Sequence, residues 1–234
     1  RLYTPQQGLM LLDLESGIGS KPKYIVSNET TQAAACRLVC KEKISDLVVL
    51  NFASARNAGG GFITGAKAQE EDLARCSGLY PCLLTQPSYY AENCHQQSLL
   101  YTDHIIYSPK VPWFRIRSRT RLDYIFLASV ITAPAPNAGQ ALSKQTASKA
   151  EIEECLRRRS GIVLSIARDN GHRNLVLGAW GCGVFANDPV MVADAFASWL
   201  ESKKFAGAFD QVSFAVLDRS KGGDTYSAFE QRYT

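Results

Sequence analysis

The residues best suited to chemistry are the acidic pair Glu70 and Glu71, which follows three successive glycines, Gly59, Gly60 and Gly61, within one short segment. Glycine lacks a Cβ and adopts positive φ at little cost, so the backbone N–H groups of such a run can converge on an anion. A carboxylate pair can supply the acid and the base that glycosidic cleavage needs. Together the two features predict a site that cleaves a phosphorylated compound.

A strand, a loop and a helix must position these residues. Residues 46–51 form an apolar, strand-like run that leads into the glycine loop, and residues 67–75 have the pattern of a helix. Loops that leave strand ends in this way commonly bind ligands in open α/β sheets. Successive residues on a helix are about 100° apart around its axis, so Glu70 and Glu71 cannot point at the same atom. We therefore expect the two carboxylates to have different roles.

Two separate blocks of sequence carry a family resemblance. Residues 51–62, 68–71 and 77–80 closely resemble the signature of the microbial-type poly(ADP-ribose) glycohydrolases, which are built on a macrodomain. Residues 178–189 resemble the diphosphate-binding loop of the same family and the start of the helix behind it. Because both blocks occur in the family's order, the resemblance covers most of the chain, from residue 24 to residue 229.

The resemblance implies a specific activity. It implies hydrolysis of the ribose–ribose bonds of poly(ADP-ribose) with release of ADP-ribose, where Glu71 protonates the leaving oxygen and later deprotonates water. Glu70 would hold ribose hydroxyls, and Gln69 would support the loop. The other substrate-binding residues that it implies are Asn57, Gly59, Gly60, Gly61, Gly181, Cys182, Gly183, Val184 and Phe185, with Asn28 and Glu29 as contacts for adenine. Neither a metal nor a cofactor is implied.

Each of these features also has a purely structural interpretation. Three glycines can form tight turns, and acidic residues in the first turn of a helix complement its dipole. Phe185 and Trp180 can be core aromatics, and for Trp180 we prefer that interpretation. Asn57 can occupy a left-handed turn, while Asn28 and Glu29 can end a strand and begin a helix. The second block favours ligand binding for the glycines.

Composition bounds the class of protein. A chain of 234 residues with a formal net charge of +4 can bury one full core, and this charge permits a polyanionic substrate without requiring nucleic acid. The seven cysteines lack regular spacing, which favours reduced thiols in an intracellular compartment, the cytoplasm or nucleus. Residues 124–136, the most apolar stretch, are too few to span a bilayer.

These observations lead to an expected organisation. We expect one macrodomain-like catalytic domain over residues 1–234, with residues 1–22 as an extension packed on it. The expected partners are poly(ADP-ribose), ADP-ribose and the ADP-ribosylated proteins that carry the polymer. We expect a monomer that binds neither membranes nor nucleic acid directly.

The order of elements predicts an α/β fold, a three-layer α/β/α macrodomain with a mixed central sheet. We predict strands at residues 23–26, 46–52, 104–107, 122–132, 174–178 and 212–217, and helices at 30–43, 67–75, 189–202 and 226–232. Helical pieces are expected within 79–100, and a long helical region over 144–170 is expected to break near Gly161. The name macrodomain comes from the resemblance, because alternation of strands and helices alone does not specify it.

Other residues are less informative. His95, His104 and His172 lack the spacing of metal ligands, so we interpret them as structural or exposed. Cys182 has no histidine near it in sequence, and we expect a small side chain there rather than a nucleophile. Asn187 is expected to cap a turn.

Four arginines alternate in the sequence, at positions 115, 117, 119 and 121. This spacing places all four on one face of an extended segment. The resulting basic strip could steer an anionic polymer, but a solvated hairpin edge that discourages aggregation is the preferred interpretation.

Three other functions compete with cleavage of the polymer. The first is a reader module that binds ADP-ribose without cleavage, which the intact Gln69, Glu70 and Glu71 argue against. The second is an enzyme that removes single ADP-ribose units from proteins or nucleic-acid ends. The third is a P-loop nucleotide-binding protein, which is disfavoured because no Lys-Ser/Thr pair follows the glycines.

Overall fold

A mixed sheet forms the centre of the computed structural model, which describes residues 1–14, 18–117 and 120–234. Within that part of the chain the strands are β1 (Leu2–Tyr3), β2 (Lys23–Ser27), β3 (Leu47–Phe52), β4 (Ile105–Arg117), β5 (Thr120–Ala133), β6 (Asn174–Leu177) and β7 (Gln211–Ala215). Their order across the sheet is β1-β4-β5-β3-β6-β7-β2. The neighbours from β5 to β2 are parallel, whereas β4 is antiparallel to both β1 and β5. The prediction of a mixed sheet is confirmed.

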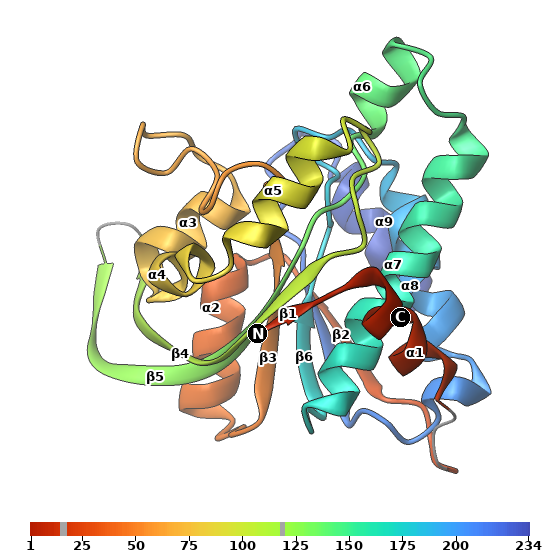
Figure 1. The fold of residues 1–234 in the computed structure, drawn as a ribbon. Coiled ribbons are helices and arrows are strands. Elements are labelled where there is room, and N and C mark those ends of the chain that lie inside the picture. The colour runs from red at the N-terminus through yellow and green to blue at the C-terminus, as the bar shows by residue number, and fades with distance from the viewer. Residues whose placement is uncertain (15–17, 118–119) are drawn as a thin grey trace.

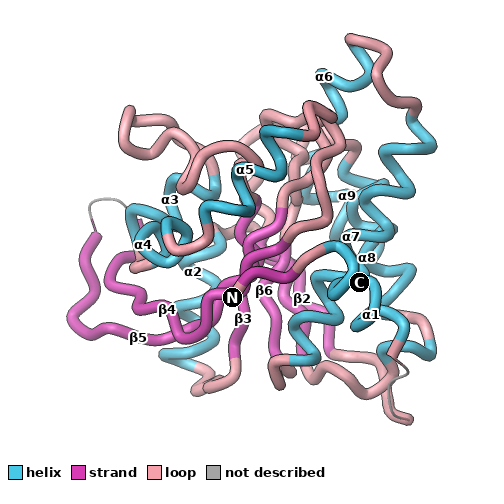
Figure 2. Tube along the Cα trace, in the orientation of Figure 1, coloured by secondary structure: helices cyan, strands magenta, loops and turns pink. Residues whose placement is uncertain are grey.

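Helices cover both faces of this sheet (Figures 1 and 2). The first face carries α2 (Thr31–Cys36), which continues into a π-helical turn (Arg37–Lys41), with α3 (Gln69–Cys76), α4 (Leu79–Leu84) and α5 (Pro87–His95). The other face carries α1 (Pro5–Asp13), α7 (Lys149–Asp169), α8 (Pro189–Leu200) and α9 (Asp224–Tyr233). The short α6 (Ala138–Ser143) and a 3₁₀ turn (Lys203–Phe205) complete the described helices. The predicted three-layer α/β/α architecture is confirmed.

The central strand β3 shows why two cores form. Its side chains alternate, so Val48 and Leu50 enter the core under α7 and α8, while Leu47 and Val49 enter the core under α2 and α3. Burial of each such side chain contributes about 1.5–3 kcal/mol. A strand buried on both faces reads as a continuous apolar run, which is how residues 46–52 were recognised.

The strand β4 is much longer than the predicted strand at residues 104–107. Pro109 and Pro112 interrupt the run, and proline cannot donate to a sheet ladder, so the sequence indicated an early end. The β4–β5 pairing tolerates them through an irregularity between Ser108 and Val111, where Lys110 has a φ of 48°. The result is a long hairpin that extends below α4 (Figure 1).

The predicted arginine strip lies at the end of this hairpin and does not form one extended segment. Arg115 on β4 stands opposite Arg121 on β5, and the strand residue Arg117 stands opposite Thr120. Arg119 lies outside the described residues. Because β4 and β5 are antiparallel partners, this pairing agrees with the preferred interpretation of the arginines as part of a hairpin edge.

The helix α7 continues through Gly161, where a break was predicted. A Cβ at this glycine would lie 2.7 Å from Trp199 Cε2 and 2.9 Å from Leu12 Cδ1. Glycine is needed here because α8 and the N-terminal α1 pack closely on α7, and the tertiary packing outweighs its poor helix propensity.

The N-terminal strand β1 pairs with the edge of β4. No helix among the described residues is long and apolar enough to cross a membrane.

Candidate active site

The carboxylates lie in the first turn of α3, at the edge of the sheet where the parallel strands end. Phe52 N–H donates to Gln69 Oε1 (2.8 Å), and Gln69 Nε2 donates to Leu50 O (2.8 Å) and Thr31 Oγ1 (3.2 Å). Gln69 therefore binds the backbone of β3 on both sides of Asn51. This attachment fixes the start of α3 against the end of the strand, while a role of Gln69 in substrate binding stays a prediction.

Glu70 points into the protein and is only 2% exposed. Its Oε1 accepts a hydrogen bond from Asn51 Nδ2 (3.1 Å), and its Oε2 accepts one from Ser54 N–H (2.7 Å). Asn51 Nδ2 also donates to Thr132 Oγ1 on β5 (3.2 Å). Burial raises the pKa of Glu70 to about 8 although these hydrogen bonds favour the charged form, and the neighbouring Glu71 also raises it.

Glu71 points in a different direction, toward the glycine loop. Its Oε1 accepts a hydrogen bond from Gly61 N–H (3.0 Å), and the residue is 9% exposed. Gly60 lies against both carboxylates, since a Cβ there would be 2.3 Å from Glu71 Oε1 and 3.3 Å from Glu70 Oε2. The two acids thus have different partners, which agrees with the argument from helix geometry.

The shift of Glu70 predicts a dependence of stability on pH. An acid whose pKa is higher in the folded chain stabilises the fold fully below its ordinary value of 4.5, and this contribution is lost as the pH rises through about 8. We expect the free energy of unfolding of the wild type to fall by several kcal/mol over this range relative to Glu70→Gln, which does not titrate. Urea unfolding of both proteins at pH 5 and pH 8.5 measures this; equal changes in the two proteins would contradict it.

Two amides of the first glycine loop are bonded within the protein, one of them to a carboxylate. Gly60 N–H donates to Asn57 O (3.0 Å), and Gly61 N–H donates to Glu71. Two of the three amides predicted to bind a diphosphate are therefore bonded within the protein. Gly59 has a φ of 69° and packs against Phe62 and Tyr80, and the side chain of Asn57 is exposed.

The second loop, between β6 and α8, presents free amides. The N–H groups of Gly183, Val184 and Phe185 donate to no acceptor among the described residues. Its shape is fixed by Asn187, whose Nδ2 donates to Pro136 O (2.8 Å) and Gly181 O (3.1 Å). Gly181 has a φ of 74°, and a Cβ there would be 2.4 Å from Asn187 Nδ2. Successive free amides can bind an anion, so the binding of a diphosphate by this loop stays a prediction.

The remaining predicted residues of this region have defined partners. Cys182 is half-buried, and this burial raises the pKa of its thiol to about 12, which keeps it protonated and agrees with its rejection as a nucleophile. Trp180 is fully buried and donates to Ala133 O (3.1 Å), so its assignment to the core is confirmed. Asn187 closes the loop, as expected of a turn cap.

The two residues predicted to contact adenine are already bonded elsewhere. Glu29 accepts from Ser27 Oγ (2.9 Å) and forms an ion pair with Arg37 (2.7 Å). Asn28 exchanges hydrogen bonds with the backbone of Asp218. Both lie just after β2, on the same edge of the sheet as the glycine loops. Their contact with adenine stays a prediction.

The histidines do not gather into a metal site. His172 is buried, donates from Nδ1 to Asp46 O (2.6 Å) and accepts at Nε2 from the Tyr107 hydroxyl (2.8 Å), and burial lowers its pKa. His104 bonds Thr102 Oγ1 (2.9 Å), and His95 is exposed. Across the described ranges no three His, Cys, Asp or Glu side chains are placed to hold a metal ion.

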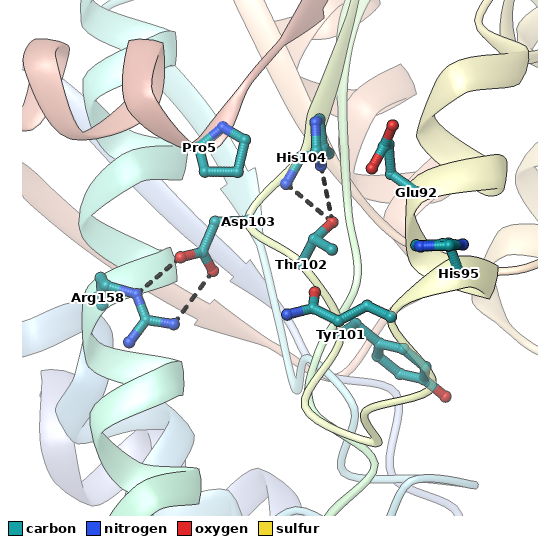
Figure 3. Close-up of a pocket in the computed structure, with 9 residues that line it drawn as sticks. Pro5, Glu92, His95, Tyr101, Thr102, Asp103, His104 and Arg158 are labelled. Carbon is teal, nitrogen blue, oxygen red and sulfur yellow. Dashed lines mark hydrogen bonds and ion pairs between the residues drawn. The ribbon is translucent and has the colours of Figure 1, made fainter.

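A cavity of about 450 Å³ lies away from the carboxylates, between α5, the start of α1 and α7 (Figure 3). Glu92, His104 and Arg158 line it, and Arg158 pairs with Asp103 (2.7 Å). None of the residues predicted to bind or cleave the substrate lines this cavity, although His95 and His104, interpreted from sequence as structural or exposed, do. Tyr101 stands at its edge, with its ring directed away from Asp103 and Arg158 (Figure 3).

Sequence reasoning did not assign several residues that the fold brings to the site. Asn51 stood within the recognised block, but its bond to Glu70 joins positions 19 apart and has no local signal. The hydroxyls of Tyr89 and Tyr90 on α5 are buried and bond no described residue. Burial raises the pKa of each tyrosine, and the charge of Glu70 adds to the rise.

A mixed sheet between two helical layers, with the ligand-side loops at the carboxyl ends of its parallel strands, is the architecture of a macrodomain. Residues 1–116, which include both carboxylates and the first glycine loop, match the family model described as microbial-type PARG, catalytic domain. A search of the curated proteins found no match.

Solved structures give the same family over the rest of the chain. The poly(ADP-ribose) glycohydrolase of Thermomonospora curvata is 45% identical, with a TM-score of 0.93 and coverage of 99% of this chain and 85% of that one. The same enzyme has been solved with the inhibitor ADP-HPD at a TM-score of 0.91, with 45% identity and coverage of 99% and 84%. The glycohydrolase of Deinococcus radiodurans in complex with ADP-ribose is 48% identical, with a TM-score of 0.92 and coverage of 99% and 93%. This chain belongs to the microbial-type poly(ADP-ribose) glycohydrolase family.

Proposed function

We propose that the chain is a poly(ADP-ribose) glycohydrolase, which hydrolyses the ribose–ribose bonds of the polymer and releases ADP-ribose. The observation that carries the proposal is the pair of buried carboxylates in the first turn of α3, held in different directions by Asn51 and Ser54 on one side and Gly61 on the other. Family membership supports it, as do the relatives solved with ADP-ribose and ADP-HPD.

The chemistry assigns a different task to each group. Glu71 donates a proton to the oxygen of the leaving ribose while the bond from that oxygen to the anomeric carbon breaks, and the resulting carboxylate then removes a proton from the attacking water. Glu70 binds ribose hydroxyls, and the free amides of Gly183, Val184 and Phe185 bind the diphosphate. Phe185 provides a flat apolar surface for a ribose. No step of this sequence uses a metal or a cofactor.

Gly60 provides a steric test of this arrangement. We expect Gly60→Ala to reduce the rate of ADP-ribose release about 100-fold or more, because its Cβ would displace the carboxylate of Glu71, and small displacements of reacting groups have effects of that size. Release is measured by chromatography. Gly65→Ala is the matched control, since Gly65 also has positive φ (90°) but a Cβ there meets nothing within 4 Å. Equal rates in the two variants would contradict this account of Gly60.

The choice of substrate separates the proposal from its rivals. The experiment compares release of ADP-ribose from purified poly(ADP-ribose) with release from mono-ADP-ribosylated protein, at equal concentrations of ADP-ribose units. The proposal predicts faster release from the polymer. Faster release from the mono-modified protein would instead assign the chain to removal of single units, and binding without release from either would assign it to a reader module.

The proposal extends to the setting of the enzyme. It includes ADP-ribosylated proteins as carriers of the polymer, action as a monomer, and no direct binding of nucleic acid or membranes. It also includes a reducing compartment, the cytoplasm or nucleus, in which the seven cysteines, all of them free thiols, persist in that form.

A further inference from the structure

The loop before β4 holds a tyrosine in a strained conformation. Tyr101 has a φ of 60°, in the left-handed region that side chains other than glycine, asparagine and aspartate rarely adopt. Backbone strain of this kind is unfavourable and persists only where the surroundings enforce it, and such positions cluster at functional sites. A function of the Tyr101 side chain would therefore account for this conformation.

Hydrogen bonds with buried polar side chains hold this conformation in place. Arg159 on α7, which is fully buried, donates to Leu100 O (2.9 Å) and Tyr101 O (3.3 Å). On the other side, Asn93 of α5 accepts at Oδ1 from Thr102 N–H (2.8 Å) and Thr102 Oγ1 (3.0 Å). The backbone on both sides of Tyr101 is thus fixed to two helices.

The ring of Tyr101 faces the second glycine-containing loop. Its centroid lies 5.9 Å from that of Phe185, with an angle of 41° between the planes. Phe185 is itself anchored, because its carbonyl accepts from Gly139 N–H at the start of α6 (2.9 Å). Two aromatic rings from separate, fixed loops therefore form one continuous surface beside the free amides.

Tyr89 on α5 is influenced by both ends of this region. Burial raises its pKa, and the charges of Glu70 and Tyr101 add to the rise. Tyr101 is half-buried at the edge of the cavity of Figure 3, with its ring directed away from Asp103 and Arg158.

We propose that Tyr101 is a specificity-determining residue that forms, with Phe185, an aromatic wall against the distal ribose of the bound ADP-ribose unit. The proposal rests on the proposed function. A flat group stacked between two rings needs about 7 Å between them, twice an ordinary carbon–carbon contact. The centroids of Tyr101 and Phe185 are only 5.9 Å apart, so nothing can insert between these two rings. A ribose instead packs its apolar C–H face on the wall, while the phenol hydroxyl of Tyr101 is free to bond a sugar hydroxyl.

The test uses Tyr101→Gly, which removes the ring and also relieves the positive φ. We expect its thermal unfolding midpoint to equal or exceed that of the wild type, while its affinity for ADP-ribose, measured by calorimetry, falls about ten-fold. Affinity for ADP, which lacks the distal ribose, should stay within two-fold. With polymer as substrate, KM should rise with little change in kcat. Tyr124→Ala, which removes an exposed tyrosine ring on β5, is the control and should change none of these values.

Two results would overturn the proposal. Unchanged ADP-ribose affinity in Tyr101→Gly would show that the ring does not touch the ligand, and an equal loss of ADP affinity would place the contact on the nucleoside or diphosphate instead of the ribose. Tyr101→Phe gives a second readout, since loss of the hydroxyl alone should produce a smaller effect than loss of the ring. Failure of the proposed function would look different: the wild type would bind ADP-ribose but release none, and the comparison of ADP-ribose with ADP would still decide the role of Tyr101.

Discussion

Glu71→Gln is expected to slow release of ADP-ribose from poly(ADP-ribose) by a factor of 100 to 10,000, the range that a positioned general acid and base contributes. Glutamine keeps the shape of the side chain and can still accept the hydrogen bond from Gly61 N–H, but it can neither protonate the leaving oxygen nor deprotonate water. The loss should appear in the first-order rate constant of ADP-ribose release measured under single-turnover conditions. Affinity for ADP-ribose should change little.

Neighbouring acids supply controls for this variant. Asp72 lies in the same first turn, is half-exposed and pairs with Arg75 (3.3 Å) at the surface, so Asp72→Asn should keep nearly the full rate. Glu70→Gln should weaken binding as well as turnover, since Glu70 is assigned to the ribose hydroxyls. If Glu71→Gln kept a rate near that of Asp72→Asn, another group would have to be the acid.

Arg159→Met is expected to lower the free energy of unfolding by about 3–5 kcal/mol, the usual cost of removing one partner from a buried ion pair. Arg159 is 0% exposed, pairs with Asp103 (2.8 Å) and donates to the carbonyl of Pro134 (2.7 Å) as well as to those of the loop before β4. The variant removes the donor to the buried carbonyl of Pro134 and leaves Asp103 paired with Arg158 alone. Denaturant unfolding followed by circular dichroism measures the change.

The neighbouring Arg157 gives the matched control. It forms an exposed pair with Glu154 (3.0 Å) one turn away on the same helix, and such surface pairs contribute at most about 1 kcal/mol. Arg157→Met should therefore change stability little. A loss below about 1 kcal/mol in Arg159→Met would show that the buried pair does not stabilise the fold as argued.

The sequence predicted the parts of the fold that have local signals. The apolar run of β3, the glycine loop and the start of α3 follow one another between Leu47 and Gln69, and all three were predicted in this order, with α3 beginning two residues later than predicted. The long helix α7 was predicted to break because Gly161 is a poor helix former. What makes that glycine necessary, the approach of Trp199 and Leu12, comes from distant parts of the chain.

In the site, too, features with a local sequence signal were predicted and features that depend on distant residues were not. Separate directions for Glu70 and Glu71 follow from helical geometry and were predicted. The use of the amides of Gly60 and Gly61 within the protein was not, because it depends on how the carboxylates fold back onto the loop. Tyr101 was missed altogether, since its approach to Phe185 joins segments that are far apart in sequence and its strained φ is a property of the folded loop.

The measurement that tests the central claim most directly is an analysis of the products formed from purified poly(ADP-ribose) by the wild type and by Glu71→Gln, with ADP-ribose binding measured on both. The account predicts free ADP-ribose as the product of the wild type, little or none from the variant, and binding by both. Binding by the wild type without release of ADP-ribose would contradict it, as would full release by Glu71→Gln.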